Sequence, residues 1–515
     1  MRGLSRLKNE SLTQFSHRLA SCYNAANSKA AKKDKGQFFT PPAVAKYMAS
    51  FINQSKEEVS ILDPGAGIGI LSVAVIENLV KQNHVKKIKL TCYETDKTAL
   101  PYLKKLLDEI KKELNKNMSF GYIILNQDFI LSKASVLTTN LLNYNQSQEK
   151  FDVIISNPPY FKLNKKDIPI YKFKDIVLGQ PNIYFLFMAL SSKLLNKDGE
   201  MVFITPRSFC SGLYYNKFRK WLIGQVYFAN IHLFDSRKDL FTNENVLQEN
   251  IITHFKKKES KNITIYKTTN GDFSCRQKIK VLKEDVMYRT NGHIFFRIPS
   301  TKEELRIIRG LDRLPNNFFK LGIKISTGKV IAFRNKEYLQ KSLTKNSLPL
   351  LWMHNIKDGR IEWPNTKKDK AIAIKKCNGT KNLLLKTNNY LVLKRFTTKE
   401  QKRRFETACI FKTDFKEFEY FALDNMINYI YNPNQSLTKN QIKGIAKYLS
   451  LPIVDSYFRI LNGHTQVNAN EVYALPFPSL VQLEDFGKEK TSIQTFRNKL
   501  TLNNIQENQT IEIPA

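Results

Sequence analysis

Between residue 58 and about residue 256, short apolar runs alternate with stretches whose apolar residues recur at helical spacing. The runs have the length and composition of strands, and they are VSIL (59–62), IKLTCY (88–93), GYIIL (121–125), DVIIS (152–156), MVFIT (201–205) and NIHLF (230–234). Strands that alternate with helices predict a mainly parallel sheet covered on both faces. Ligands of such sheets bind at the carboxyl ends of the strands, near the point where strand order reverses.

The rest of the chain predicts two flanking regions. Residues 1–30 are expected to form a helical N-terminal extension before an α/β domain of residues 31–258. The charged stretch HFKKKESKN, residues 254–262, ends the alternation and indicates a domain boundary. Residues 259–515 carry basic clusters, many aromatic residues and polar loops, and they are long enough for a substantial second domain.

The charge of the chain favours a polyanionic partner. It has 82 Lys+Arg against 46 Asp+Glu, a net charge of +36, and a pI of about 9.7. Such a balance is typical of nucleic-acid binding. Lys, Asn and Ile are all abundant, however, as in proteins from AT-rich genomes, so the charge supports a nucleic-acid role without establishing one.

Other compositional features exclude several classes of protein. No apolar run reaches the roughly 18 residues of a membrane span, and the polar start has no signal-peptide core, so we expect a cytoplasmic protein and no membrane partner. The six cysteines are scattered and never form a C-x-x-C pair, and the seven histidines are dispersed. We therefore expect reduced thiols and no metal site.

A glycine-rich segment, DPGAGIG, follows the first predicted strand at residues 63–69. Gly65 and Gly67 allow the backbone to approach a ligand that a Cβ would exclude. The spacing Gly-x-Gly-x-Gly differs from the dinucleotide fingerprint. Asp63 suits a cationic ligand group, such as an amino-acid ammonium, and does not suit a pyrophosphate.

Two further acids follow the next predicted strands. Glu94 ends the second strand, where a carboxylate can accept hydrogen bonds from ribose hydroxyls. Asp128 and Phe129 follow the third strand, where an acid can bond an adenine amine while an aromatic ring stacks on the base. A single acid at a strand end is most often a helix cap or a solvated loop residue, but three in succession favour a nucleoside-binding edge.

The segment Ser156-Asn157-Pro158-Pro159-Tyr160 ends the fourth predicted strand. Two consecutive prolines remove amide donors and fix the turn, which leaves the Asn157 side-chain oxygen and the Pro158 carbonyl as acceptors for a primary amine. Tyr160 offers a flat face on which a base can stack. In an arbitrary sequence this would be an ordinary turn, but its place after three acidic strand ends favours a catalytic site.

These motifs, in this order, resemble the gamma class of N6-adenine DNA methyltransferases. The family has an F-x-T-P-P-type segment, here GQFFTPP at residues 36–42, then D-x-G-x-G-x-G, the ribose acid, the adenine acid and N-P-P-Y. The likeness covers residues 31 to about 256. Segments 203–222, 233–241 and 246–252 resemble one branch of the family, and 327–334 and 458–478 resemble methylases of the PstI/BsuBI type.

The resemblance implies a Rossmann-like class I S-adenosylmethionine-dependent domain with a mainly parallel seven-stranded sheet, followed by an α+β target-recognition domain in residues 259–515. It also implies a role for each motif residue. The methionine part of the cofactor would contact Phe38, Thr40, Asp63, Gly65 and Gly67. The cofactor ribose would contact Glu94, and the cofactor adenine would contact Asp128 and Phe129. The target base would contact Asn157, Pro158, Pro159 and Tyr160, with Phe241 on its opposite face.

The implied activity is transfer of a methyl group from S-adenosyl-L-methionine to adenine N6 in a specific sequence of double-stranded DNA. The target nucleotide is flipped out of the duplex, because its amine is otherwise out of reach. Neither a metal nor a covalent enzyme intermediate is needed. The implied partner is a separate cognate restriction endonuclease, and the implied location is the bacterial cytoplasm, at the nucleoid.

Three alternatives are weaker. N-P-P-Y also serves methyltransferases of RNA and of protein glutamine, but a basic second domain and the F-F-T-P-P entry favour DNA. A bifunctional restriction and modification chain is not expected, because the motifs begin near residue 31 and leave no room for an N-terminal nuclease domain. A DNA-binding protein on an inactive scaffold is disfavoured by the intact motifs.

Overall fold

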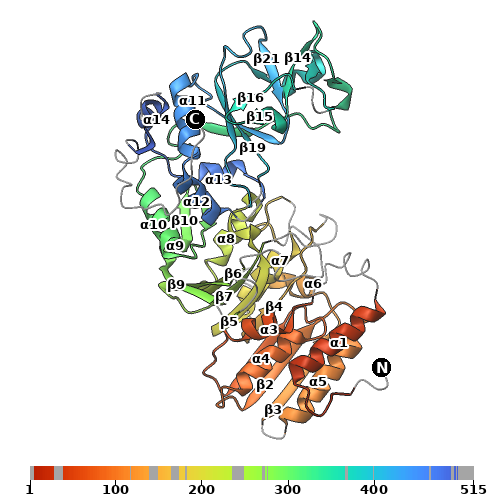
Figure 1. Ribbon diagram of the computed structural model, residues 1–515. Coiled ribbons are helices and arrows are strands. Elements are labelled where there is room, and N and C mark those ends of the chain that lie inside the picture. Colours follow the sequence, from red (N-terminus) through yellow and green to blue (C-terminus); the bar gives the residue numbers. More distant parts are fainter. Residues whose placement is uncertain are drawn as a thin grey trace. The chain divides into compact units, whose positions relative to one another are not determined.

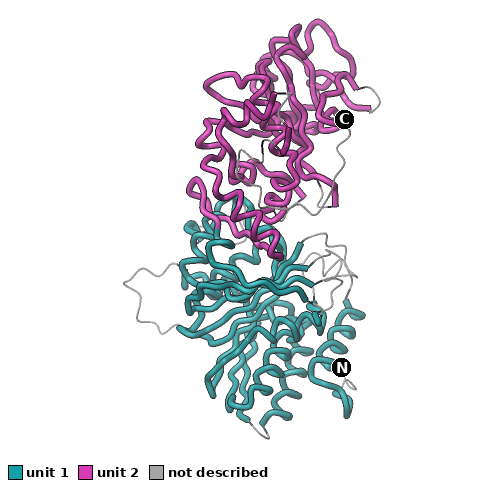
Figure 2. Tube along the Cα trace, turned by 60° about the vertical axis from the view of Figure 1, so that its left-hand side comes forward, with its two compact units in different colours: residues 1–287 teal, residues 288–515 magenta. Residues whose placement is uncertain are grey.

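The computed structural model shows two compact units, Met1–Met287 and Tyr288–Ala515 (Figures 1 and 2). We describe each unit by itself. The described residues are 5–27, 39–115, 118–137, 149–163, 173–179, 182–234, 249–268, 273–274, 276–365, 369–397, 400–462, 465–488, 492–494 and 496.

A large, mostly parallel sheet forms the centre of the first unit. Its strands are β1 (Glu58–Asp63), β2 (Lys87–Tyr93), β3 (Ser119–Leu125), β4 (Phe151–Ser156), β5 (Leu195–Pro206), β6 (Tyr227–Phe234), β7 (Asn250–Lys256), β8 (Asn262–Thr268) and β9 (Arg276–Leu282). Their order is β3-β2-β1-β4-β5-β7-β6-β8-β9. Strands β1 to β5 pair in parallel, whereas β7 is antiparallel to both neighbours. The predicted α/β fold is confirmed, and each of the six predicted strands lies within one of β1 to β6.

The sheet and the limit of this unit differ from those expected from the sequence. Among the described residues the sheet has nine strands rather than seven, because β8 pairs with β6 and β9 pairs with β8. The charged residues near 258 form only the connection between β7 and β8, and Ile263 and Ile265 beyond it are buried in the same unit. The unit therefore ends at Met287 and not at residue 258.

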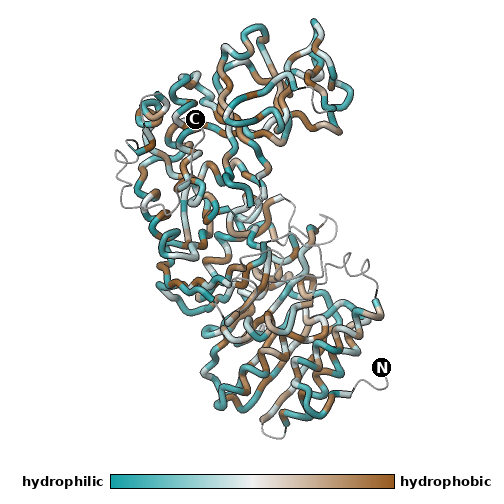
Figure 3. Tube along the Cα trace, in the orientation of Figure 1, coloured by the Kyte–Doolittle hydropathy of each residue, from teal (hydrophilic) through white to brown (hydrophobic). Residues whose placement is uncertain are grey.

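Helices cover both faces of this sheet. One layer contains α1 (Leu12–Ala26), α3 (Pro42–Ala49), α4 (Ile70–Val80) and α5 (Leu100–Leu114), whose buried residues share a core with alternate strand residues such as Ile61, Leu90 and Val153. The other layer contains α6 (Phe129–Lys133), α7 (Ile183–Leu194) and α8 (Asn216–Leu222). Short elements complete the unit: η1 (Ala134–Leu137), η4 (Arg207–Cys210), η5 (Leu213–Tyr215) and α9 (Lys283–Val286). Hydrophobic residues recur both in the strands and in the helices that cover them (Figure 3).

The N-terminal helix α1, predicted as a helical extension, packs into this core. A capping box starts it, because the Ser11 hydroxyl accepts from the Gln14 backbone N–H and the Gln14 side chain accepts from Ser11 in return. Phe15, Leu19 and Tyr23 then recur on one helical face, and all three are buried against α4 and α5.

The second unit has the predicted α+β composition, and its described residues form two main sheets, the two-stranded sheets β10-β11 and β15-β16, and a group of helices. Its strands are β10 (Met287–Thr290), β11 (His293–Phe296), β12 (Lys324–Thr327), β13 (Leu339–Gln340), β14 (Ser347–Leu351), β15 (Ile356–Lys357), β16 (Arg360–Ile361), β17 (Ala373–Lys375), β18 (Leu384–Lys386), β19 (Tyr390–Lys394), β20 (Thr407–Ile410), β21 (Tyr420–Leu423) and β22 (Ile427–Tyr431). Its helices are α10 (Lys302–Leu311), α11 (Lys439–Leu449), α12 (Pro452–Leu461), α13 (Ala469–Tyr473) and α14 (Leu480–Gly487), with short turns η6 (Lys336–Tyr338), η7 (Met353–Asn355) and η8 (Asn378–Leu383).

The two main sheets of the second unit have the orders β12-β22-β19-β20 and β13-β17-β14-β21-β18. Leu391, Leu393 and Ile430 of the four-stranded sheet share a core with residues of all five helices. Most strands here have five residues or fewer, so their apolar residues do not show the alternation that is visible in the first unit.

Candidate functional site

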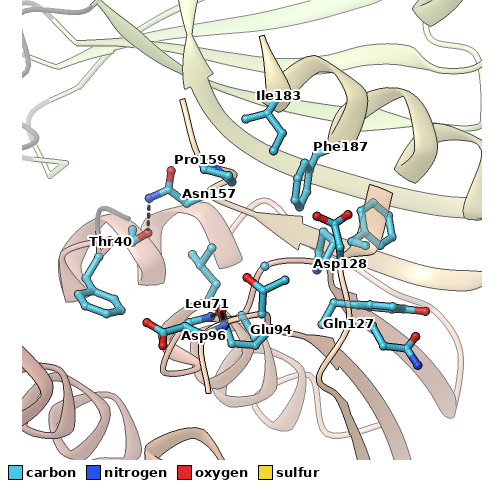
Figure 4. Close-up of a pocket in the computed structure, with 18 of the residues that line it drawn as sticks. Thr40, Leu71, Glu94, Asp96, Gln127, Asp128, Asn157, Pro159, Ile183 and Phe187 are labelled. Carbon is cyan, nitrogen blue, oxygen red and sulfur yellow. Dashed lines mark hydrogen bonds between the residues drawn. The ribbon is translucent and has the colours of Figure 1, made fainter. Parts of the chain in front are cut away.

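A cavity of about 530 Å³ lies where the carboxyl ends of β1 to β4 meet, at the point where strand order reverses (Figure 4). Its volume falls within the range of small-molecule sites. The lining residues come from six segments of the chain: Phe39, Thr40, Pro64, Gly65, Ala66, Gly67, Ile70, Leu71, Tyr93, Glu94, Thr95, Asp96, Lys97, Thr98, Gln127, Asp128, Phe129, Asn157, Pro159, Phe161, Ile183 and Phe187.

The glycine-rich segment forms the floor of this cavity between β1 and α4. Gly67 has a φ of 55°, and a Cβ on it would lie 3.2 Å from the ring of Phe39. Gly69 has a φ of 86° and precedes the first residue of α4, where a Cβ would lie 2.8 Å from Leu103. Both positions therefore require glycine, because the backbone is left-handed and the neighbouring side chains are in contact.

Glu94 is attached to the glycine-rich segment by hydrogen bonds. Its carboxylate accepts from the backbone N–H groups of Gly67 and Asp96, each at 2.7 Å. Burial raises the pKa of Glu94, while these two backbone donors lower it. A carboxylate has about four lone-pair sites, so these two bonds leave it able to accept further bonds from a ligand hydroxyl.

Asp63 lies beneath the glycine-rich segment and does not line the cavity. It is fully buried, and its Oδ2 accepts a 2.7 Å hydrogen bond from the Ser72 hydroxyl. Its Oδ1 accepts no hydrogen bond from any described residue. Burial raises the pKa of Asp63 to about 7, because the charged form loses its hydration there.

Asp128 and Phe129 lie at the opposite wall, at the start of α6. Asp128 caps this helix by accepting from the Leu131 backbone N–H at 2.9 Å. The Phe129 ring is 2% exposed, and its centroid is 5.3 Å from those of Tyr93 and Phe187. The ring thus belongs to the aromatic core of this layer, and only a small part of it faces the cavity.

The N-P-P-Y segment follows β4 on the other side of the cavity. The Asn157 amide donates from Nδ2 to the Thr40 hydroxyl at 3.1 Å, and its Oδ1 accepts from the Tyr160 hydroxyl at 2.6 Å. That hydroxyl also lies 2.9 Å from the Ile204 carbonyl oxygen. Figure 4 shows Asn157 directed at Thr40, with Pro159 beside it. Donor and acceptor contacts together set the orientation of the amide.

Burial raises the pKa of Tyr160 well above its usual range, so the hydroxyl keeps its proton and can donate to Asn157. Neither Tyr160 nor Pro158 lines the cavity itself, whereas Asn157 and Pro159 do. The structure thus brings eight of the predicted residues to one cavity: Thr40, Gly65, Gly67, Glu94, Asp128, Phe129, Asn157 and Pro159. Phe38 and Phe241 lie outside the described residues.

Phe39 and Asp96 are two of the lining residues that the sequence did not predict. Phe39 lies over Gly67, and its ring is edge-on to Tyr23 of α1 at 5.4 Å. Asp96 is 5% exposed and accepts from the Tyr23 hydroxyl at 2.5 Å and from Thr98. The one signal in the sequence that could have indicated Asp96 was its position two residues after Glu94, the acid at the end of β2.

The arrangement fits a ligand that has an amino-acid part and a nucleoside part. The floor of the cavity is glycine backbone, where a Cβ would take up space that a ligand can use. The carboxylates of Glu94 and Asp128, which follow neighbouring strands, face the cavity. One buried oxygen of Asp63 has no hydrogen-bond donor among the described residues. Among the described residues, no group of three or more His, Cys, Asp or Glu side chains is placed to hold a metal ion.

Comparison with known proteins identifies the family. Residues 73–241 match the family model of the Eco57I restriction-modification methylase. The chain is 36% identical over 471 residues to the type II methyltransferase M.PstI of Providencia stuartii, across 90% of this chain and 92% of that protein. It is 32% identical over 462 residues to M.BsuBI of Bacillus subtilis, across 89% and 90%. The chain therefore belongs to the type II restriction-modification methyltransferases.

A likeness to a solved structure is more distant. The structure of the type IIL restriction-modification enzyme MmeI in complex with DNA has 12% identity and a TM-score of 0.49, across 96% of this chain and 75% of that one. The predicted family, including its resemblance to the PstI and BsuBI methylases, is confirmed by the sequence relatives.

Proposed function

We propose that this chain methylates adenine N6 in a specific sequence of double-stranded DNA, with S-adenosyl-L-methionine as the methyl donor. One observation carries the proposal: Thr40 and Tyr160 hold the Asn157 amide in a set orientation at the end of β4, beside a cavity suited to a nucleoside ligand. Family membership supplies the reaction class, and the site supplies the acceptor.

The cofactor would occupy the cavity. Gly65, Gly67 and Thr40 would surround its methionine part, Glu94 would accept from the ribose, and Asp128 would accept from the adenine amine. When bound, S-adenosylmethionine supplies an electrophilic methyl group. Asp63 lies one layer below the glycines, so its contribution is electrostatic: the raised pKa of this buried acid falls when a cationic group approaches, and the carboxylate then favours that cation.

The target amine would be held by the N-P-P-Y segment. Asn157 Oδ1 and the Pro158 carbonyl would accept the two amine hydrogens, which draws the nitrogen out of conjugation with its ring and exposes its lone pair. Positive charge develops on this nitrogen during transfer, and two fixed acceptors stabilise it without reorganisation. Because the Tyr160 hydroxyl bonds Asn157 Oδ1, the acceptor is already oriented before the base enters.

We assign DNA recognition to the second unit and propose that methylation protects DNA from a separate endonuclease with the same target sequence. Base-edge contacts depend on side-chain geometry and not on a motif, so the target sequence has to be measured. In the part of the chain that the structure describes, no helix is both long enough and apolar enough to cross a bilayer.

The test is transfer of tritium from labelled S-adenosylmethionine to plasmid DNA that comes from a host without DNA methylation. After digestion to nucleosides, the label is expected in N6-methyladenine, at one sequence that single-molecule sequencing then identifies. Total RNA and a cell extract treated with nuclease serve as rival acceptors. Label in methylcytosine, RNA or protein in place of N6-methyladenine would contradict the proposal.

A further inference from the structure

The second unit exposes a phenylalanine on a loop that is otherwise firmly attached to its sheet. This loop, residues 328–335, follows β12. The Gly328 N–H donates to the Ile427 carbonyl at 2.8 Å, and the Val330 N–H donates to the Leu423 carbonyl at 3.0 Å. Val330 is fully buried. Backbone hydrogen bonds therefore attach the base of the loop to the neighbouring strands.

Close packing around Gly328 leaves no room for a side chain at this position. A Cβ on Gly328 would lie 2.2 Å from the Asp424 carbonyl oxygen, so only glycine lets the two backbones approach. The Asn425 N–H also donates to the Val330 carbonyl at 2.9 Å. The loop is consequently fixed to the connection between β21 and β22.

The tip of the loop is a closed turn. The Asn335 side-chain oxygen accepts from the Ile331 N–H at 2.8 Å, and the backbone N–H groups of Arg334 and Asn335 both donate to the Ile331 carbonyl at 2.9 Å. Phe333 lies within this turn and is 78% exposed, the highest value among the large hydrophobic side chains that the structure describes. The backbone around Phe333 is thus ordered while its ring faces solvent.

Basic residues flank Phe333 in the sequence. Lys329, Arg334 and Lys336 are exposed, and Glu337 is the one acidic residue in the segment 328–337. The Arg334 guanidinium lies 5.4 Å from the centroid of the Phe333 ring. An exposed aromatic ring in a basic segment matches a nucleic acid, which offers base faces for stacking and phosphates for charge pairing.

We propose that Phe333 is a DNA-contacting residue whose ring packs against a base of the duplex, while Arg334 and Lys329 bind the adjacent phosphates. The proposal rests on the proposed function for the identity of the nucleic acid. Proteins that deform duplex DNA insert phenylalanine side chains between base steps in this way. The firm attachment of the loop favours binding, because a ring that is already positioned loses little conformational entropy when it contacts DNA.

The experiment uses the full chain and three variants, Phe333→Ala, Phe333→Trp and Phe319→Ala. Phe319 is the matched control, because it is 72% exposed and belongs to the same unit. The first measurement is kcat/KM for methylation of unmethylated plasmid DNA. Stacking on one base predicts a fall of about 5- to 150-fold for Phe333→Ala, from its usual free energy. Phe333→Trp should stay within about threefold of wild type, since indole also stacks.

The second measurement is independent of catalysis. Tryptophan fluorescence of the Phe333→Trp variant should be quenched on addition of the plasmid, beyond the quenching of the wild-type chain, because stacking on a base quenches indole emission. This readout separates two failures. If the wild type does not methylate DNA but Phe333→Trp is quenched, the DNA contact stands and the proposed function falls.

Three results would overturn the proposal: equal kcat/KM for Phe333→Ala and wild type, an equal loss for Phe319→Ala, or no additional quenching in the Phe333→Trp variant. A change of the oligomeric state in Phe333→Ala, measured by light scattering without DNA, would also overturn it and assign the ring to contact with a second copy of the chain.

Discussion

The two units carry the same net charge but differ in how their function can be located. Met1–Met287 has 44 Lys+Arg and 26 Asp+Glu, and Tyr288–Ala515 has 38 and 20, so each has a net charge of +18. In the first unit, the candidate residues follow successive strands and meet at one buried edge. In the second unit, the proposed contact is a single exposed ring on a loop.

This difference has a physical reason. Catalysis requires groups that are preorganised and shielded from water. The sheet holds such groups in place, so catalytic residues are found in the sequence at the ends of strands. DNA recognition requires exposed groups whose spacing matches the duplex, and many loop arrangements supply them. Net charge increases affinity for DNA in either unit and therefore does not show which unit reads the sequence.

The largest expected effect comes from separating the units. A fragment that ends at Met287 keeps all nine strands of the sheet and every lining residue of the cavity, so it should bind S-adenosylmethionine within about twofold of the full chain. Methyl transfer to plasmid DNA should fall by roughly 1,000-fold or more, the usual minimum ratio of specific to nonspecific DNA affinity. Isothermal titration and tritium transfer measure the two quantities.

A fragment that ends at residue 258 is the matched control, because it also removes β8 and β9. It loses the buried Ile263 and Ile265 and exposes the edge of β6, so its melting temperature should be lower than that of the longer fragment. Methylation by the longer fragment at the rate of the full chain would show that the first unit recognises DNA by itself.

The second prediction concerns chemistry that belongs to the first unit alone. Asn157→Ala removes the proposed acceptor for the target amine and none of the groups proposed to contact the cofactor. The rate of single-turnover methylation should fall by about 100- to 1,000-fold, the effect of losing one preorganised hydrogen bond in a transition state. Affinities for cofactor and DNA should change little. A rate within about threefold of wild type would remove Asn157 from the mechanism.

Much of the first unit could be predicted from sequence, because parallel strands bring their carboxyl ends to one edge. Glu94 and Asn157 are 63 residues apart along the chain and Asp128 lies between them, yet all three line one cavity. The sheet extends beyond the predicted boundary at residue 258, because the charged connection after β7 resembles a linker although the chain returns to the same sheet. Local composition does not show which strand a segment will join.

Other features depend on tertiary contacts that leave no periodic signal. Phe39 and Asp96 line the cavity and both contact Tyr23 of α1, a helix that the sequence assigned to an N-terminal extension. In the second unit, strands as short as two residues show no alternation, so only the α+β class could be predicted there. The roles of all the predicted site residues toward ligands stay predictions, and Pro158, Tyr160 and Asp63 do not line the cavity.

The third prediction is a dependence of stability on pH that comes from the first unit. The pKa of Asp63 is raised from 3.8 to about 7 in the folded chain, so the folded state holds a proton that the unfolded state has released. Stability from this group is complete below about pH 4 and is lost as pH rises through 7. The shift corresponds to at most about 4 kcal/mol, by the usual free energy per pKa unit.

Asp63→Asn keeps an acceptor for the Ser72 hydroxyl and has no carboxylate to ionise. Between pH 5 and pH 8, the melting temperature of wild type should therefore decrease relative to that of the variant. The same difference should appear in the fragment that ends at Met287, since Asp63 and Ser72 both belong to the first unit. Parallel melting curves of wild type and variant across this range would exclude a buried neutral Asp63.

The smallest expected effect separates the two roles of Tyr160. Tyr160→Phe keeps the ring against which the target base would stack but removes the hydroxyl that bonds Asn157 Oδ1. A neutral hydrogen bond contributes about 0.5–1.5 kcal/mol, so the single-turnover rate should fall only about 2- to 12-fold, far less than for Asn157→Ala. Because Thr40 still holds Asn157 Nδ2, the amide keeps one of its two anchors. Tyr160→Ala removes ring and hydroxyl together and should lower the rate further. If Tyr160→Phe were as inactive as Asn157→Ala, the hydroxyl would act in the chemical step itself, and orientation of the amide would not be its main role.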